Sequence, residues 1–303
     1  MVRRMSENGM EFRRGTLIRG IGSFYTVRDP EGETYTLRCK KKFRRQNLSP
    51  MTGDEVLFTP GTGEEDGWIE EILPRKTECL RPPVANVTRL VVVISPVPEP
   101  DMLLADRLIS RAFAQGMDVV IAVNKSDLDP GMGGRIRQEY AAAGIPVFPV
   151  CALTGEGLDA LKEGMRGALC CLTGQSGAGK STILNALLGL SLETGDISRK
   201  IARGRNTTRQ SELIEKDGLR VMDTAGFNLL EPEKRLEPEK LKERYPEFRP
   251  YEGKCRFREC LHDREPGCAV SQAVEEHLLN AERVERYRQL LNETREVWRT
   301  RYD

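Results

Sequence analysis

The chain has 303 residues, and its 47 basic and 46 acidic side chains leave a formal net charge of +1. This length predicts about two or three domains, and the balanced charge does not by itself indicate a nucleic-acid partner. No segment has the apolar length of a membrane span or the apolar core of a signal peptide. We therefore expect a cytoplasmic protein with no membrane contact.

Residues 1–75 are expected to form a small β-barrel. Short apolar and β-branched runs, such as Phe24–Val27 and Val56–Phe58, alternate with turns rich in Gly, Pro and Asp. No helical pattern separates these runs, which favours a barrel or a sandwich. Residues 76–83 are predicted to be a linker, because their paired prolines resist both helix and central strand.

From residue 84 to residue 231 the pattern changes to that of an α/β domain. Buried-strand runs at 90–94, 119–123 and 168–172 alternate with helical patterns such as 104–114. Continuous apolar runs of this kind are typical of a parallel sheet covered by helices. Residues 232–303 are charged and interrupted by prolines, and they are predicted to form a helical domain around a cluster of Cys and His residues.

A phosphate-binding loop follows the strand predicted at 168–172. The spacing G-x-x-x-x-G-K-[ST] is present, and a helical pattern comes directly after it. Backbone N–H groups of such a loop surround a phosphate, the lysine neutralises it, and Ser181 would bind Mg²⁺. The alternative, a glycine-rich turn with a chance lysine, does not explain the strand and helix context. The predicted nucleotide ligands are Gly174, Gln175, Ser176, Gly177, Ala178, Gly179, Lys180, Ser181 and Thr182.

A guanine-reading motif ends the strand predicted at 119–123. Its residues are Asn124, Lys125, Ser126 and Asp127. A carboxylate at the fourth position can accept two hydrogen bonds from guanine, which adenine cannot supply. The motif alone also fits a solvated turn. A second loop, Cys151, Ala152 and Leu153, is similar to the loop whose backbone N–H contacts guanine in GTPases, and the pair favours GTP over ATP.

Two further segments resemble nucleotide switches. Asp223 and Gly226 form a D-x-x-G motif that would reach Mg²⁺ and the γ-phosphate, and Thr208 or Thr207 would close on the same ion. Phe227 stands where many GTPases place a water-orienting glutamine. We therefore expect slow intrinsic hydrolysis that a partner accelerates. A nucleotide-binding switch with little chemistry is the alternative.

The order of the motifs is unusual. In an ordinary Ras-like chain the phosphate loop comes first and N-K-x-D follows it, whereas here N-K-x-D precedes the phosphate loop. The same strands and loops can assemble in either order. The sequence therefore predicts a circularly permuted P-loop GTPase domain.

A compact metal site is predicted near the end of the chain. Cys255, Cys260, His262 and Cys268 supply three thiolates and one imidazole, which matches a closed tetrahedral structural zinc site. With four protein ligands, no position is left open for catalysis. The alternative is a chance grouping.

A basic run interrupts the β-rich segment. Its residues are Lys40, Lys41, Lys42, Phe43, Arg44 and Arg45. Charge interleaved with an aromatic side chain is typical of a nucleic-acid-binding loop, but charge runs are often only solvated loops. From the residues alone, both interpretations stay open.

The ordered set of motifs resembles one family, the circularly permuted small-ribosomal-subunit-dependent GTPases called RsgA, YjeQ or EngC. The resemblance covers nearly the whole chain, from the Thr52-Gly53-Asp54 turn to the cluster that ends at Cys268. It implies an N-terminal OB-fold, a permuted GTPase domain and a C-terminal zinc domain. It also implies rRNA binding, action late in maturation of the small subunit, and GTP hydrolysis stimulated by that subunit.

The chain departs from the family in its first switch, where Asn206 replaces the histidine of the usual Gly-Arg-His-Thr-Thr. That histidine is a candidate for positioning water, so its absence leaves the catalytic residue unassigned. We expect a monomer that binds GTP and GDP, Mg²⁺ with the nucleotide, and one structural Zn²⁺. The rival interpretations are an RNA-binding checkpoint module that uses GTP only as a ligand, and an ATP-dependent enzyme.

Overall fold

The computed structural model describes residues 12–45, 48–61, 65–80, 83–190, 211–223 and 236–301. The chain divides into two compact units. The first unit contains residues 1–88, 165–172 and 193–227, and the second contains residues 89–164, 173–192 and 228–303. Within the described segments, no helix combines the length and the apolar character needed to cross a membrane.

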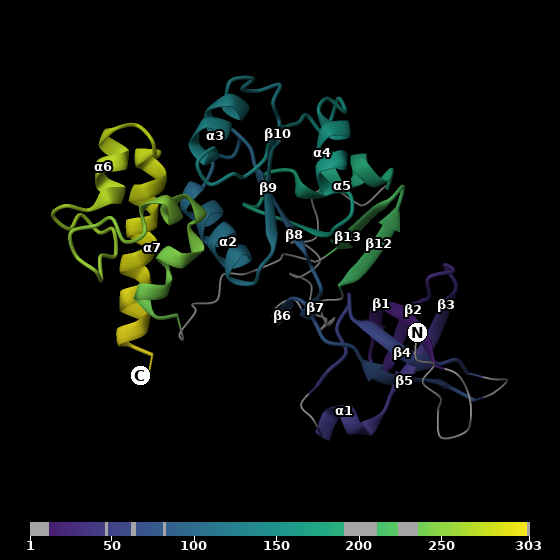
Figure 1. The fold of residues 1–303 in the computed structure, drawn as a ribbon. Coiled ribbons are helices and arrows are strands. Elements are labelled where there is room, and N and C mark those ends of the chain that lie inside the picture. Colours follow the sequence, from purple (N-terminus) through teal and green to yellow (C-terminus); the bar gives the residue numbers. More distant parts are fainter. Residues whose placement is uncertain are drawn as a thin grey trace. The chain divides into compact units, whose positions relative to one another are not determined.

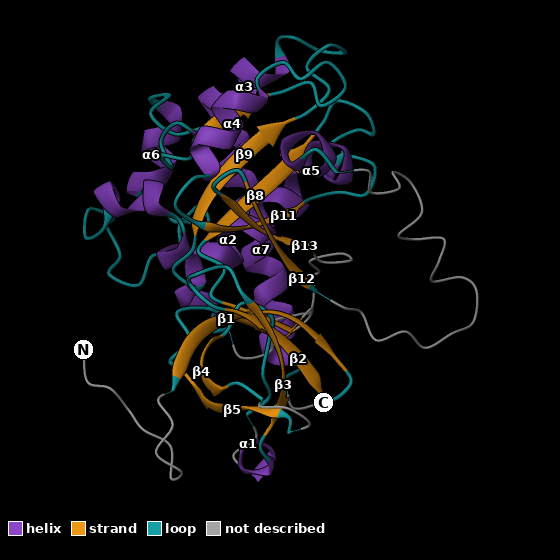
Figure 2. Ribbon diagram, turned by 90° about the vertical axis from the view of Figure 1, so that its right-hand side faces the viewer, coloured by secondary structure: helices purple, strands orange, loops and turns teal. Residues whose placement is uncertain are grey.

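A closed five-stranded barrel begins the first unit (Figures 1 and 2). β1 pairs with both β2 and β4, while β3 pairs with β2 and β5, and β5 pairs with β4. The strands are β1 (Arg13–Ile21), β2 (Phe24–Arg28), β3 (Thr34–Cys39), β4 (Glu55–Thr59) and β5 (Gly67–Ile72). Alternate side chains face inward and form the barrel core, which includes Leu17, Val27, Leu37, Val56, Phe58 and Ile69. The predicted β-barrel is confirmed.

The basic run lies on a short helix, α1 (Lys41–Arg45), and not in a loop. Phe43 is only 3% exposed and packs into the barrel core. Lys40 is bound to the barrel as well, since its Nζ lies 2.5 Å from Glu70 Oε2. The expectation that no helix lies between the strands of the barrel is therefore wrong, and residues 41–45 form a helix where a loop was expected. Burying a phenylalanine is worth about 1.5–3 kcal/mol, which favours this arrangement.

Part of the segment predicted as a linker forms a β-hairpin. β6 (Glu78–Leu80) pairs with β7 (Pro83–Ala85) in an antiparallel two-stranded sheet. This sheet is packed against the Thr52-Gly53 turn, because Ala85 N donates to Thr52 O at 2.9 Å. Gly53 has φ +95°, and a Cβ there would lie 2.1 Å from Ala85 O. Only glycine fits this turn. Residues 78–80 and 83–85 therefore form an ordered sheet that packs on the turn, and they are not a flexible linker.

Three more strands complete the first unit. They are β11 (Leu169–Thr173), β12 (Glu212–Lys216) and β13 (Leu219–Asp223). β13 pairs with β11 in parallel and with β12 in antiparallel orientation. β12 also pairs with barrel strand β1, through Arg19 and Glu212.

The second unit contains a parallel sheet, and two of its three strands were predicted from the continuous apolar runs at 90–94 and 119–123. β8 (Arg89–Ile94), β9 (Asp118–Val123) and β10 (Val147–Pro149) pair in parallel. The connecting helices are α2 (Met102–Ala114), α3 (Met132–Tyr140), α4 (Leu158–Met165) and α5 (Lys180–Leu188). Parallel strands end at one edge of their sheet, so the loops after β8, β9 and β10 are brought together there.

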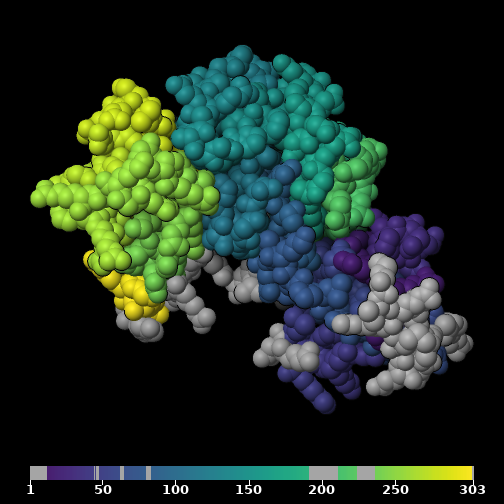
Figure 3. All heavy atoms as spheres, in the orientation of Figure 1, coloured from purple at the N-terminus to yellow at the C-terminus, as the bar shows by residue number. Residues whose placement is uncertain are grey.

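The C-terminal segment of the second unit is helical (Figure 1, green to yellow), and Figure 3 shows its atoms as spheres in the same colours. Its elements are the 3₁₀ turns η2 (Pro238–Lys240), η3 (Lys242–Arg244) and η4 (Pro246–Tyr251), and the helices α6 (Ala269–Glu275) and α7 (Ala281–Arg299). Tyr245, Phe248 and Tyr287 form an aromatic core with ring centroids 4.8 to 5.2 Å apart. Asn280 caps α7, since its side chain accepts a hydrogen bond from Arg283 N.

A buried ionic network joins α7 to α2, α3 and η4. Asp106 of α2 is 1% exposed, and its carboxylate accepts from Arg283 and Arg286 of α7 and from the Tyr140 hydroxyl. Arg283 Nε also lies 2.5 Å from Glu247 Oε1. Because each buried charge here has an opposite partner, the network fixes α7 against the helices of the sheet.

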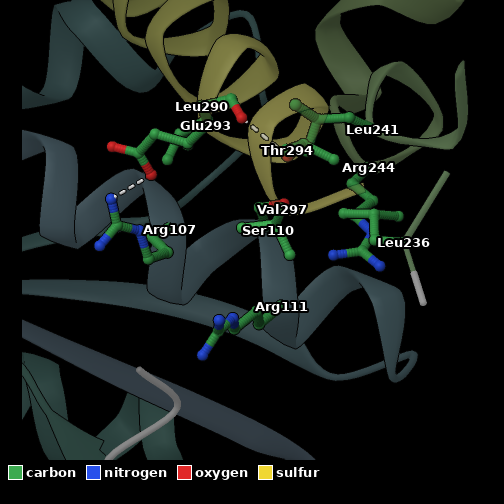
Figure 4. A pocket seen from close by; sticks show the side chains of 10 residues that line it. All are labelled: Arg107, Ser110, Arg111, Leu236, Leu241, Arg244, Leu290, Glu293, Thr294 and Val297. Atoms are coloured by element: carbon green, nitrogen blue, oxygen red, sulfur yellow. Dashed lines mark hydrogen bonds and ion pairs between the residues drawn. The ribbon is translucent and has the colours of Figure 1, made fainter. Parts of the chain in front are cut away.

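A cavity of about 130 Å³ lies beside this network, between α2 and α7 (Figure 4). Across it Arg107 Nη2 lies 2.6 Å from Glu293 Oε2, which adds a second ionic contact between the two helices. Arg111 and Arg244 also line it. The lining contains none of the predicted nucleotide or metal ligands.

We predict that Asp106→Asn lowers the free energy of unfolding by about 3 kcal/mol, because Arg283, Arg286 and Tyr140 lose the buried carboxylate to which all three donate, although Glu247 still pairs with Arg283 and Glu139 with Arg286. Urea denaturation followed by circular dichroism measures the effect. Asp118→Asn is the matched control. The Asp118 side chain pairs with Arg89 but is 72% exposed, so its loss should change the free energy of unfolding by less than about 1 kcal/mol. Equal effects of the two variants would contradict a structural role for the network.

Candidate functional site

The predicted phosphate loop links β11 to α5, as expected. Gly174 has φ +132°, and a Cβ there would lie 2.2 Å from Val93 O. Gly179 has φ +93°, and a Cβ there would lie 2.2 Å from Asn124 Nδ2. Both glycines are therefore required by left-handed backbone and by close packing. Lys180 begins α5, so the free N–H groups of the first turn of α5 adjoin the loop and favour an anion.

Lys180 turns back towards the loop from the first turn of α5. Its Nζ donates to Gly174 O at 2.9 Å and to Gln175 O at 2.8 Å. Burial lowers the pKa of Lys180 below the usual lysine value. A cation held against the loop backbone is placed to neutralise an anion that the loop binds.

Asn124 connects the two nucleotide loops predicted from separate parts of the chain. Its side chain is buried, and Nδ2 donates to Ala178 O in the phosphate loop at 3.0 Å. Its Oδ1 accepts from Ala152 N in the second guanine loop at 3.1 Å. One amide therefore fixes the phosphate loop and the Cys151–Leu153 loop relative to each other.

Lys125 and Asp127 extend this arrangement. Lys125 has φ +60°, and its Nζ donates to Gly177 O at 2.9 Å, so it also binds the phosphate loop. Cys151 Sγ donates to Asp127 Oδ1 at 3.2 Å. This contact joins the Asp127 carboxylate to the second guanine loop. Leu153, in contrast, is 83% exposed.

Asp223 ends β13 in the first unit and faces Glu212 of β12. Burial raises the pKa of Asp223, and the Glu212 charge adds to the shift. A carboxyl in this state gains from a nearby cation, as expected of a group that serves Mg²⁺. The other predicted switch residues, Asn206, Thr207, Thr208, Gly226 and Phe227, lie outside the described residues.

The Cys and His cluster is assembled in the second unit. The ligand atoms of Cys255, Cys260, His262 and Cys268 all lie within 4.8 Å of one another. The three Sγ atoms lie 3.5 to 3.7 Å from His262 Nδ1. A tetrahedral zinc ion with ordinary Zn–S and Zn–N bonds requires a sulfur to nitrogen separation of ~3.6 Å. The residues present therefore fit a four-coordinate metal ion.

The surroundings of the cluster also suit a metal. Burial lowers the pKa of His262 to about 4, which keeps the imidazole neutral as a ligand must be. Burial raises the pKa of the Cys260 thiol, so a thiolate there needs a cation. Backbone N–H groups point at two sulfurs, with His262 N 3.4 Å from Cys260 Sγ and Ala269 N 3.3 Å from Cys255 Sγ. The cluster could hold one metal ion.

Comparison with known proteins places the chain in a family. The sequence model of the RsgA GTPase matches residues 72–233, and that of the RsgA N-terminal domain matches residues 14–69. The chain belongs to the RsgA GTPase family. Together with the solved structures described next and the cluster geometry above, this match confirms the predicted fold, a circularly permuted GTPase domain with an N-terminal barrel and a C-terminal cysteine cluster.

Relatives cover nearly the full chain. A small ribosomal subunit biogenesis GTPase RsgA of Ruminiclostridium cellulolyticum is 40% identical, over 93% of this chain and 94% of its own. One of Moorella thermoacetica is 41% identical, over 92% of this chain and 96% of its own. The crystal structure of YjeQ from Thermotoga maritima superposes with a TM-score of 0.80 at 33% identity, over 93% and 98% of the two chains. YloQ, described as a circularly permuted GTPase, gives 0.77 at 28% identity, over 97% and 98%.

The structure adds residues that the sequence patterns did not single out. Asp101 N donates to Gln175 Oε1 at 2.9 Å, so the loop before α2 contacts the phosphate loop. Pro98 lies against Gly177, where an added Cβ would be 3.3 Å from Pro98 Cδ. These contacts join residues about 75 positions apart, and only their place after a predicted strand, β8, could have indicated them.

We predict that Asp127→Asn weakens GTP binding roughly 100-fold or more and shifts preference to xanthosine triphosphate. The amide opposes the donors of guanine but complements the extra carbonyl of xanthine. Titration with fluorescent nucleotides measures both affinities. Asp129→Asn is the control on the same loop, because its carboxylate is bound to Arg135 and should leave GTP affinity unchanged. Unaltered GTP affinity in Asp127→Asn would contradict the guanine-reading role.

Proposed function

We propose that this chain is a Mg²⁺-dependent GTP hydrolase that acts late in maturation of the small (30S) ribosomal subunit. The observation that carries the proposal is the Asn124 amide, which bonds the phosphate loop and the second guanine loop at once. Relatives that cover nearly the full chain are named small ribosomal subunit biogenesis GTPase. A guanine-specific phosphate site in this family fits that activity.

In the proposed reaction, the Gly174–Thr182 loop binds the phosphates and Lys180 neutralises the charge between them. Asn124, Lys125, Ser126 and Asp127, with Cys151, Ala152 and Leu153, hold the guanine. Ser181, Asp223 and one of the two switch threonines, Thr207 or Thr208, serve Mg²⁺, which supplies charge stabilisation when bound. Gly226 N–H contacts the γ-phosphate, and the products are GDP and phosphate.

The proposed intrinsic rate is low. Asn206 and Phe227 occupy the positions at which GTPases of this type are expected to orient water, and neither side chain acts as a general base. The small subunit would then stimulate hydrolysis by completing the site. We also infer that the protein is a cytoplasmic monomer.

Binding to rRNA is part of the same proposal. Helix α1 exposes three basic side chains, those of Lys41, Lys42 and Arg45. These three side chains suit contacts with phosphates, and Arg44 is included in the proposal on its charge alone, whereas Phe43 is buried and does not stack on a base. Lys40 contributes less, because Glu70 neutralises it.

The metal in the cysteine cluster is proposed to be one structural Zn²⁺. Three thiolates and one imidazole form a ligand set that zinc prefers, and they fill a tetrahedron. The rings of Phe248 and His262 make an edge-to-face contact, with ring centroids 5.3 Å apart. The metal would therefore hold the core between η4 and α7 together.

We predict slow phosphate release from GTP by the protein alone and stimulation of at least about tenfold by small ribosomal subunits. A coupled phosphate assay with and without subunits measures both rates. Lys180→Ala is the control, since loss of the phosphate-loop cation should abolish turnover in both conditions. Isolated large subunits should give no stimulation.

Absence of turnover by the unmodified protein in both conditions, with GTP still bound, would overturn the hydrolase and favour an RNA-binding checkpoint module. Turnover of ATP at the same rate as GTP would favour an ATP-dependent enzyme. Turnover that subunits do not change would leave a GTPase but remove the ribosomal partner.

We predict one zinc per chain, lost in Cys260→Ser together with part of the helical signal of α6 and α7, because structural zinc binding supplies folding free energy. Metal analysis by mass spectrometry and far-ultraviolet circular dichroism measure both. Cys39→Ser, in barrel strand β3, is the matched control and should keep its zinc. A purified wild-type protein that folds with no bound metal would contradict the assignment.

A further inference from the structure

A row of exposed side chains crosses four strands of the barrel. Ile21 of β1 pairs with Phe24 of β2, Phe24 pairs with Arg38 of β3, and Arg38 pairs with Trp68 of β5. Side chains of directly paired residues point to the same face of a sheet. The four residues therefore form one continuous row, on strands that lie side by side in Figure 2.

The row points away from the barrel core. Leu37 and Ile69, the chain neighbours of Arg38 and Trp68, are 1% and 0% exposed and face inward. Ile21 and Phe24 are each 43% exposed, Trp68 is 37% exposed, and the Arg38 side chain is 44% exposed. Among the described residues, eight large apolar side chains are exposed, and Ile21, Phe24 and Trp68 are three of them. Their gathering in one row marks an interaction surface.

Arg38 gives the row its chemical character. Its guanidinium carbon lies 4.8 Å from the centroid of the Phe24 ring, so the cation already stacks on an aromatic face. Arg38 Nε lies 2.7 Å from Asp66 Oδ2, but both side chains are more than two-fifths exposed. An exposed ion pair of this kind contributes little and leaves the guanidinium available to an incoming anion or base.

Unpaired nucleobases fit this row better than an apolar protein segment does. Aromatic rings and a planar cation are the groups on which bases stack. Phe24 and Trp68 stand two strands apart, roughly 10 Å, so each ring has room for its own base beside Arg38. Thr26 and Thr36, which pair in the next outward row beside Arg19, add hydroxyl groups and one cation to this face.

The row also lies next to the exposed lysines of α1. Arg38 precedes Lys41, the first residue of α1, by three positions, at most about 10 Å of extended chain. A strand whose bases stack on the row can therefore place a neighbouring phosphate near α1. The aromatic group that the basic run lacks, since Phe43 is buried, is supplied by Phe24 and Trp68.

We propose that Ile21, Phe24, Arg38 and Trp68 form the base-stacking part of a single-stranded RNA-binding surface on the barrel. This proposal rests on the rRNA binding included in the proposed function, and it names the residues that contact bases. Recognition is by stacking, so unpaired segments bind and base-paired segments, whose faces are covered, do not.

Tryptophan fluorescence tests the proposal directly, because the chain has two tryptophans. In a Trp298→Phe parent Trp68 is the only tryptophan, and its emission is selected by exciting at wavelengths that tyrosine does not absorb. Titration with a 12-nucleotide oligouridylate should quench this emission, and a duplex RNA of the same length should quench it far less. Phe24→Ala should weaken oligouridylate binding about 5- to 150-fold, as loss of one stacked base predicts. Trp68→Ala is measured by fluorescence anisotropy of labelled RNA and should behave alike.

Two variants serve as controls. Trp68→Phe keeps an aromatic face and should retain affinity within about threefold, which separates stacking from simple loss of a residue. Leu278→Ala removes an exposed apolar side chain outside the row, 58% exposed, and should leave binding unchanged. Circular dichroism verifies that Phe24→Ala and Trp68→Ala keep the barrel fold, which surface positions allow.

The proposal is overturned if the parent does not bind oligouridylate, if it binds without quenching Trp68, or if Phe24→Ala and Trp68→Ala bind RNA like the parent. Loss of small-subunit binding by these variants with RNA affinity intact would mean that the row contacts a ribosomal protein, which also overturns it. The subunit-stimulated phosphate assay on the parent judges the proposed function separately. Small subunits can stimulate GTP hydrolysis even if the row does not bind RNA, and the row can bind RNA even if subunits do not stimulate hydrolysis.

Discussion

The arrangement of the loops that are predicted to bind the nucleotide depends on one buried amide. Asn124 donates to Ala178 O and accepts from Ala152 N, and a buried amide that lost either partner would carry an unsatisfied polar group at a cost of about 1–3 kcal/mol. Gly179 is glycine for the same reason, because a Cβ at that position would lie 2.2 Å from Asn124 Nδ2. The sequence of the phosphate loop and the sequences of the loops that are predicted to bind guanine therefore constrain each other, although 54 positions separate Asn124 from Ala178.

This constraint explains why the motif order can be reversed without loss of the site. The hydrogen bonds of Asn124 and Lys125 specify which loops meet, and they are indifferent to the direction in which the chain connects them. Parallel strands β8, β9 and β10 bring their following loops to one edge whatever the order of the segments. Circular permutation moves the chain ends and leaves these contacts unchanged.

The sequence predicted what short spacing encodes. The phosphate loop, N-K-x-D and the Cys255–Cys268 cluster each lie within a few residues, so the residues that act together are already neighbours in the chain. The apolar runs predicted β8 and β9 because both faces of these strands are buried. The sequence did not predict the burial of Phe43, because five basic residues surround it and such runs are usually exposed. Its place in the barrel core became apparent only from the fold. The buried ionic network could not be predicted from the sequence, because Asp106 and Arg283 are 177 positions apart and charged residues on helices are usually exposed.

Helix α2 links the nucleotide loops with the C-terminal segment inside the second unit. At its start, Asp101 caps the helix through Leu104 N, and the backbone N–H of Asp101 bonds to Gln175 of the phosphate loop. Five residues later, in the second turn of the helix, Asp106 pairs with Arg283 and Arg286 of α7. A helical turn rises only 5.4 Å, so the contact with the phosphate loop and the contact with α7 are parts of one rigid element. The position of α7 and the position of the loop before α2 therefore both depend on the placement of this one helix, although different residues of α2 make the two contacts.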